Sequence, residues 1–482
     1  ASRFGGEVYV AWAATLSMDT VIPLGAVTSG RTELGQVPFE QFPILISAEP
    51  TARSKERRGK LVLRGTSPST RLLAHRDMTI VGPIGSAPST GGHRHGAWPM
   101  PPMDPRQPPM IGMDGLEPNV APYLPSARDT SAIPFARPRE LLRPISGDTI
   151  RLTAGLVRRR IAGKTFLMFG FNGQYPGPLI QVKQASTIYV DFRNQLDQPT
   201  AVHWHGIRLE NRNDGVPHVT QDPVMPGERF IYKLDLPDAG VYWYHPHHRE
   251  DVQQDLGLYG NLLVDSPDPL YYGPVHRSEA WMLDDLLVGE EGLIPFGADT
   301  PTHALMGRFG NVFLINGEPQ YRLTVQERSV VRLFLTNVSN TRVYNISIPG
   351  VRMKLVGSDV GKFEHEEWVD NVVISPAERY IVDVLFEHAG TFPVTNQVRA
   401  LNHLTGTYFQ EIDTLGIVAV DGKPPTPDLR GEYRELRTNS DVVLQIDSMR
   451  PHFARVADHE LVLSMRTRDL PPAIAIMAAG FP

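Results

Sequence analysis

The segment FNGQYPGPLIQVKQASTIYVDFRNQ, residues 171–195, predicts a β-sandwich, and LINGEPQYRLTVQERSVVRLFLTNVS, residues 314–339, repeats its plan. Each segment passes from Asn-Gly through a proline and a short apolar run to a polar turn, and then to an alternating strand that ends in Asn. Because side chains alternate between the two faces of a strand, Ile188, Val190 and Phe192 fall on one face. Such alternation is typical of a strand with one face in a core.

The second segment places three apolar residues on one face in the same way: Val331, Leu333 and Leu335. Asn172 and Asn316 mark corresponding points, separated by about the length of one sandwich domain and a connection. We therefore expect two related β-sandwiches, residues 147–268 and 276–422.

The rest of the chain divides into three regions by composition. Residues 1–82 alternate strand-like runs, such as FPILISAEP, with turns, and are predicted to form a small β domain. Residues 83–146 are rich in proline, glycine and methionine, which predicts a linker or an irregular surface segment. Residues 423–482 are too few for a third sandwich of the same size. The expected fold class is all-β, with tandem sandwiches preceded by the small domain and the linker.

The overall composition argues against several classes of function. The 482 residues imply roughly three domains, and a net charge of −6 without a dense basic stripe argues against nucleic acid as a partner. No run approaches the roughly 20 apolar residues needed for a membrane span. The chain has no cysteine, which excludes disulfides, thiolate catalysis and sulfur-ligated metal sites.

Two pairs stand out among the 16 histidines. TAVHWHG contains His203 and His205, and GVYWYHPHH contains His245 and His247. Residues i and i+2 of a strand share a face and lie about 6.5–7 Å apart. If the two strands meet at one edge of a sandwich, four imidazoles converge there and suit copper or zinc. The alternative is that each is an ordinary surface or core histidine, which fits a lone residue better than two neighbouring pairs.

The motifs around these histidines resemble the first domain of multicopper oxidases, the laccase-like family. Five motifs match that domain in order: HWHG, NDGVP, TQDPVMPGERF, GVYWYHPHH and GLYGNLLV. Two further motifs, NGQYPGPLI and LINGEPQYRLTV, are similar to segments of the family's first two domains. The resemblance covers residues 147–422 and implies tandem cupredoxin-like Greek-key sandwiches of the bacterial three-domain type. It also implies copper as cofactor, and one-electron oxidation of a phenol, an aromatic amine or a metal ion coupled to reduction of O2 to water.

Carried over by motif, the resemblance implies roles for five residues. His203 would bind the type 2 copper of a trinuclear cluster, and His205, His245 and His247 would bind its type 3 ions. Asp214 would help deliver protons to bound oxygen. From the sequence alone, a turn residue within NDG explains Asp214 equally well.

The family's remaining copper ligands are missing. They come from a His-Pro-x-His-x-His and a His-Cys-His segment of its last domain, and that cysteine binds the type 1 copper. Without cysteine a type 1 site is impossible within this chain, so we expect the chain alone to be inactive. Residues 423–482 resemble a linker and the start of an incomplete third cupredoxin domain, which a missing C-terminal domain or a second polypeptide would complete.

Other interpretations stay open. The chain could be a complete, non-catalytic copper-binding or interaction scaffold. A zinc hydrolase using the same histidines is a weaker alternative, because it needs three ligands and an open position, and the flanking motifs match oxidases.

Two features precede the sandwiches. Residues 1–82 loosely resemble the outer domain of anti-sigma-K-type regulators, which agrees with an extracytoplasmic location, periplasmic or secreted. Residues 91–114 hold His93, His95 and four methionines. Thioethers and imidazoles bind Cu(I), but a proline-rich wrap with methionines as gap-fillers is the favoured interpretation.

Overall fold

The computed structural model describes residues 1–15, 20–28, 32, 34–38, 42–66, 123–297, 307–359, 361–402, 407–453 and 455–456. The chain divides into two compact units, Ala1–Thr90 and Gly91–Pro482, each considered separately below. The methionine- and histidine-containing segment 91–114 and the final residues 457–482 lie outside the described residues.

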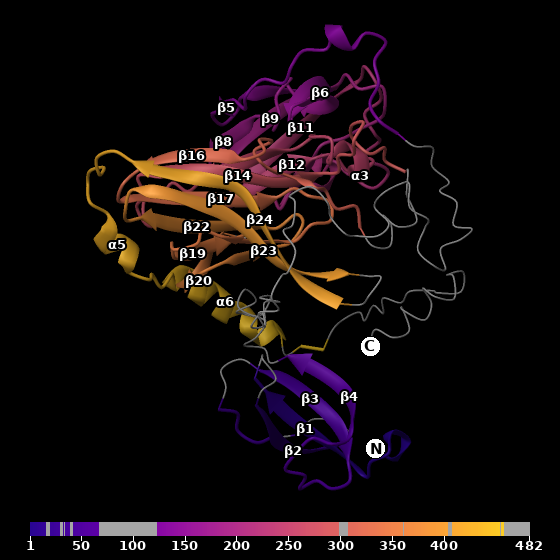
Figure 1. Ribbon diagram of the computed structural model, residues 1–482, viewed down its shortest axis with the longest axis vertical. Coiled ribbons are helices and arrows are strands. Elements are labelled where there is room, and N and C mark those ends of the chain that lie inside the picture. The colour runs from indigo at the N-terminus through magenta and orange to yellow at the C-terminus, as the bar shows by residue number, and fades with distance from the viewer. Residues whose placement is uncertain are drawn as a thin grey trace. The chain divides into compact units, whose positions relative to one another are not determined.

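The first unit holds a four-stranded antiparallel sheet with the order β2-β1-β3-β4 (Figure 1). Its strands are β1 (Val8–Ala14), β2 (Val21–Val27), β3 (Pro43–Glu49) and β4 (Lys60–Thr66). Trp12 is fully buried, and its indole donates a hydrogen bond to Ser47 Oγ at 2.9 Å. The Ser47 hydroxyl donates in turn to the Glu49 carboxylate, so these buried polar groups of the small core are paired.

The second unit begins with a sandwich of two sheets, ordered β10-β12-β13-β8-β5 and β11-β9-β6-β7. The three alternating residues Ile188, Val190 and Phe192 are fully buried between these sheets, as predicted. The strands are β5 (Leu141–Leu142), β6 (Thr149–Ile161), β7 (Lys164–Phe171), β8 (Leu179–Lys183), β9 (Ser186–Asn194), β10 (His203–His205), β11 (Arg229–Leu236), β12 (Gly240–His245) and β13 (Gly260–Asp265).

A second sandwich follows, with sheets ordered β15-β14-β17-β22-β19-β20 and β16-β24-β23-β18-β21. Val331, Leu333 and Leu335 lie in its core, again as predicted. The strands are β14 (Arg277–Leu286), β15 (Val312–Ile315), β16 (Tyr321–Gln326), β17 (Ser329–Asn337), β18 (Tyr344–Ser347), β19 (Met353–Ser358), β20 (Gly361–Val369), β21 (Val372–Ile374), β22 (Arg379–Phe386), β23 (Gly390–Asn402) and β24 (Thr407–Asp421).

The two repeats of the sequence form equivalent hydrogen bonds in the structure. Asn172 has a positive φ of 55°, and its side chain accepts from Thr153 N at 2.8 Å and donates to Arg151 O at 2.9 Å. Asn316, with φ of 53°, accepts from Met282 N at 3.0 Å and donates to Ala280 O at 3.0 Å. Each asparagine thus ties a left-handed turn to the first long strand of its sandwich.

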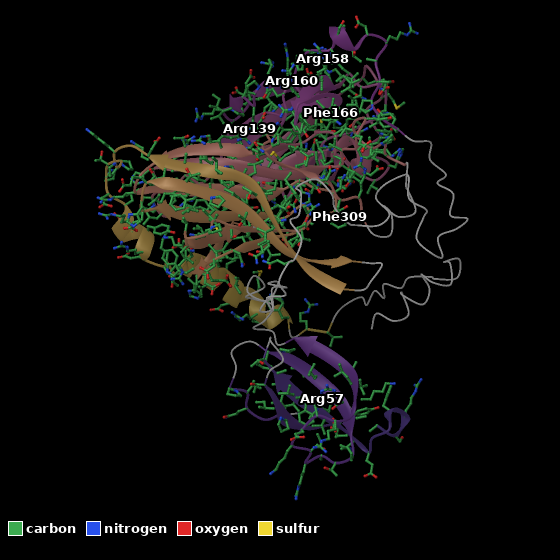
Figure 2. All side chains as sticks on the ribbon, viewed as in Figure 1. Arg57, Arg139, Arg158, Arg160, Phe166 and Phe309 are labelled. Atoms are coloured by element: carbon green, nitrogen blue, oxygen red, sulfur yellow. The ribbon has the colours of Figure 1, made fainter. Side chains whose placement is uncertain are left out.

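The two sandwiches share a buried interface within the second unit. Val241 and Leu263, from the five-stranded sheet of the first sandwich, pack against Val356 and Ile381 of the second. Arg139, labelled in Figure 2, crosses the same boundary, since its guanidinium donates to Ala280 O at 3.0 Å and lies 3.3 Å from Asn316 Oδ1. The first sandwich therefore rests on a specific face of the second.

Short helices complete the described part of the unit: α3 (Glu250–Gln253), α5 (Arg430–Arg434) and α6 (Ser440–Phe453). Tyr433 of α5 packs on Leu385 of the second sandwich. Among the described residues, no helix has both the length and the apolar character to cross a membrane.

Candidate metal centre

The strand pairing of β10 with β12 brings the two histidine pairs together. The antiparallel register places His203 opposite His245 and His205 opposite Trp243. β12 ends at His245, so His247 lies two residues beyond the strand rather than on it. Pro246 has no N–H to donate to a ladder, which suits the end of a strand.

All four predicted histidines lie in one cluster of rings. The centroid of His203 is 5.4 Å from that of His205, 5.4 Å from that of His245 and 4.6 Å from that of His247. Ligand nitrogens of three of them, His203, His245 and His247, lie within 4.8 Å of one another. His205 lies beside these three, with its Nδ1 3.4 Å from His245 Nε2.

Local contacts hold β10 in place against the sandwich. Tyr232 OH accepts the backbone N–H of Val202 at 2.9 Å, directly before His203. Gly215 has a φ of 77°, and a Cβ there would lie 1.8 Å from Val202 O, so the NDG turn approaches the strand as only glycine allows.

Three of the four rings have an acceptor at Nδ1. His203 Nδ1 lies 2.7 Å from the Asp214 carbonyl, His245 Nδ1 2.9 Å from the Pro246 carbonyl, and His247 Nδ1 2.5 Å from Glu250 Oε1. An acceptor at Nδ1 favours the tautomer with the proton there, which leaves Nε2 unprotonated and able to act as the ligand atom.

Burial keeps the rings of His203, His205 and His245 in the neutral form that a metal requires. Desolvation lowers the pKa of His245 well below its ordinary value, helped by the neighbouring histidines, and it also lowers the pKa of His203. Desolvation, followed by the positive charge of Arg379, lowers the pKa of His205 to about 3. Metal binding therefore displaces few protons from these rings at neutral pH.

Asp214 lies next to the cluster, but its closest contact is through the backbone. Its carbonyl accepts from His203, while its carboxylate Oδ1 lies 3.4 Å from the same Nδ1 and its side chain is one-third exposed. The geometry thus suits both interpretations of Asp214, the turn residue and the proton carrier.

Three further residues lie at the cluster. Trp243 stacks on the His245 ring with a centroid distance of 4.0 Å and an interplanar angle of 15°. Glu250 contacts His247, and Arg379 reaches the site from the second sandwich. The i,i+3 spacing of His247 and Glu250 could have indicated the first contact, whereas nothing local in the sequence indicates Arg379.

The fold and the cluster define an all-β protein of tandem cupredoxin-like sandwiches with a polyhistidine centre in the first. Two family models, both described as multicopper oxidase, match residues 156–269 and 297–423. The chain belongs to the multicopper oxidase family, and this membership implies copper as the metal.

Known relatives agree with that assignment. The chain is 29% identical over 289 residues to copper resistance protein A of Pseudomonas syringae pv. tomato, covering 51% of this chain and 47% of that protein. It is 31% identical over 345 residues to the multicopper oxidase MmcO of Mycobacterium tuberculosis, covering 64% of each. A crystal structure of a multi-copper oxidase from Pseudomonas thermotolerans is similar with a TM-score of 0.51 and 29% identity, covering 58% of this chain and 66% of that one.

The chain thus spans about half to two thirds of the length of these two curated relatives. The family matches begin at residue 156, and the resemblance of residues 1–82 to anti-sigma-K-type regulators stays a prediction.

Proposed function

We propose that this chain is the part of a laccase-like multicopper oxidase that supplies half of its trinuclear copper site. The whole enzyme would couple one-electron oxidation of a phenolic, amine or metal-ion substrate to reduction of O2 to water. The convergence of His203, His205, His245 and His247 at one strand pair carries the proposal. The chemistry of the donors supports copper, because imidazoles suit it and the Nδ1 acceptors of three of them favour an unprotonated Nε2.

In this proposal each histidine takes the role that its motif implies. His203 would hold the type 2 copper, and His205, His245 and His247 would hold type 3 ions. Copper held there would supply the redox chemistry by which O2 receives four electrons and, with four protons, becomes water.

The chain's own residues orient the ligands and carry protons. The Asp214 carbonyl and Glu250 fix the ring orientations of His203 and His247 through their Nδ1 atoms. Trp243 covers one face of His245 and keeps water from it. The partly exposed carboxylate of Asp214, 3.4 Å from His203, is placed to take up protons from solvent and hand them to the site.

The domain boundaries follow the same proposal. Residues 147–268 are proposed as the first cupredoxin domain and 276–422 as the second, preceded by an N-terminal β domain, 1–82, and a linker, 83–146. The end of this linker adds β5 (Leu141–Leu142) to a sheet of the first sandwich. Residues 423–482 lead into a third domain, whose type 1 copper and remaining ligands come from a C-terminal domain or a second polypeptide. We also propose an extracytoplasmic location, which agrees with the absence of cysteine.

Metal titration tests the proposal. Cu(II) added to the purified 482-residue chain should bind tightly, and the double variant His203→Ala/His247→Ala should lose that binding while keeping its fold by circular dichroism. The chain alone should not turn over a phenolic substrate. Equal copper binding by wild type and double variant would contradict the proposed site, and turnover by the chain alone would contradict the assignment of type 1 copper to a missing part.

The alternative function is a non-catalytic copper-binding or interaction scaffold, favoured by the absence of any cysteine for a type 1 site. The intact mass of the protein purified from its natural source distinguishes the oxidase from the scaffold. A mass well above 53.6 kDa, or a co-purifying polypeptide with a His-Cys-His segment, supports the oxidase, and a single species at the chain mass supports the scaffold.

A further inference from the structure

The strand that carries His203 and His205 has little to hold it within its own sheet. β10 has only 3 residues and lies at the sheet edge, so it pairs with β12 alone. Short edge segments with one hydrogen-bonded neighbour open more easily than central strands. The placement of His205, at the end of β10, therefore depends on contacts from outside the sheet.

Arg379 of the second sandwich supplies such a contact. Its side chain is only 4% exposed, and its Nε donates to Val241 O at 3.2 Å, across 138 positions of sequence. Val241 lies on β12, the strand that continues to Trp243 and His245. The guanidinium is thus anchored to the strand against which β10 pairs.

The same guanidinium lies against the residue that follows His205. Gly206 has a φ of 87°, and a Cβ built there would lie 2.2 Å from Arg379 Nη2. Only glycine leaves room for the guanidinium at this turn, so the turn and Arg379 are fitted to each other.

The second sandwich holds Arg379 rigidly. Asp359 Oδ1 lies 2.9 Å from Nη1, and it also accepts from the Arg379 backbone N–H at 2.7 Å. Ala377 O accepts from Nη1 at 3.1 Å. Because the planar fork is fixed on several sides, it can act as a support rather than as a mobile surface charge.

We propose that Arg379, held by Asp359, is a positioning residue through which the second sandwich fixes the copper ligands of the first, chiefly His205. The inference rests on the proposed copper site. It gives the second domain a direct part in building that site, because Arg379 binds the backbone of β12 at Val241 and lies against Gly206, the residue that follows His205.

The test compares two arginines of one sheet. Arg379→Gln removes the support, and Arg332→Gln is the control, because Arg332 is a similarly buried arginine of the neighbouring strand β17 and pairs with Asp383 of β22 at 2.8 Å. Each variant of the 482-residue chain is titrated with Cu(II), its EPR spectrum is recorded, and its urea midpoint is measured. The variant Arg379→Lys keeps the positive charge but lacks the planar guanidinium group.

We expect Arg379→Gln to weaken copper binding about tenfold or more and to change the Cu(II) EPR parameters. Arg332→Gln should lower the urea midpoint but leave copper affinity and EPR spectrum at wild-type values. Arg379→Lys should have a copper affinity between those of Arg379→Gln and the wild type. Gly206→Ala tests the same contact with Arg379 intact, and should shift the spectrum even if Arg379→Gln fails to fold.

The outcomes separate this inference from the proposed function. A wild-type chain that binds no copper would overturn both. Copper binding by the wild type, with unchanged affinity and EPR parameters in Arg379→Gln and Gly206→Ala, would overturn the role of Arg379 alone. A change of the spectrum as large in Arg332→Gln would also overturn it, because the effect would then reflect general loosening of the sheet.

Discussion

The partners of the three Nδ1 atoms differ in kind, and this decides which of them can be tested by substitution. His203 and His245 meet the carbonyls of Asp214 and Pro246, which no side-chain change removes. His247 instead meets the carboxylate of Glu250. A carboxylate at this position fixes the ring and also raises its basicity as a ligand.

Replacing Glu250 should therefore weaken copper binding without touching a ligand. We expect Glu250→Ala to lower copper affinity about 10–100-fold, and Glu250→Gln to lower it less, since the amide oxygen still accepts from Nδ1. Isothermal titration with Cu(II) measures both. Asp251→Asn is the control, because Asp251 lies on the same turn but pairs with Arg249 at 2.9 Å. Equal affinity of Glu250→Ala and Asp251→Asn would refute the role of Glu250.

At the scale of the elements, the two asparagine turns give each sandwich the same anchor. A residue there must tolerate a positive φ and satisfy both an N–H and a carbonyl of the adjacent strand. Asparagine does both, since its short amide bonds locally and it enters the left-handed region more readily than most residues.

Two substitutions of Asn172 separate these demands. Asn172→Gly keeps the φ and loses the amide bonds, and should lower the free energy of unfolding by about 1–3 kcal/mol. Asn172→Ala should cost about 1 kcal/mol more, because alanine is strained at a φ of 55°. Urea denaturation followed by tryptophan fluorescence measures both. Equal stability of glycine variant and wild type would mean that the amide bonds contribute nothing.

The elements also show what the sequence could and could not predict. Alternation is a local property, so it correctly predicted the buried faces of β9 and β17, and the i,i+2 spacing correctly gave His203 and His205 a common side. The pairing of β10 with β12 depends on a register set by the whole sheet. Its prediction therefore rested on the family resemblance. Arg379 is 138 positions from the carbonyl that it binds, and no pattern in the chain links the two.

At the scale of the second unit, the two sandwiches are joined by buried polar groups as well as by apolar packing. Tyr259 OH donates to Asp284 Oδ2 at 2.6 Å, and Asn261 donates to Thr336 Oγ1 at 2.8 Å. Asp255 of the first sandwich lies 3.6 Å from Arg308. Since unpaired buried polar groups are costly, these pairs specify one way of joining the sandwiches.

The protonation of Asp255 makes this junction sensitive to pH. Burial raises the pKa of Asp255 to about 7, against the opposing charge of Arg308. The folded chain therefore holds this proton up to about pH 7, whereas the unfolded chain releases it near pH 4. Between these values the unfolded state binds fewer protons, so the free energy of unfolding falls as pH rises, by at most about 1.4 kcal/mol per pH unit for one group.

Asp255→Asn should remove this contribution. Asparagine keeps the size of the side chain and carries no titrating proton, while Arg308 retains its hydrogen bond to Ile294 O at 2.6 Å and its contact with Phe296. Urea denaturation from pH 4 to pH 8 should thus give a shallower decline of stability for the variant, which gains on the wild type as the pH rises toward 7. A decline equally steep in both proteins would show that Asp255 is not the group that holds the proton, and that the junction owes its pH dependence to another carboxyl such as Asp284, whose pKa burial also raises.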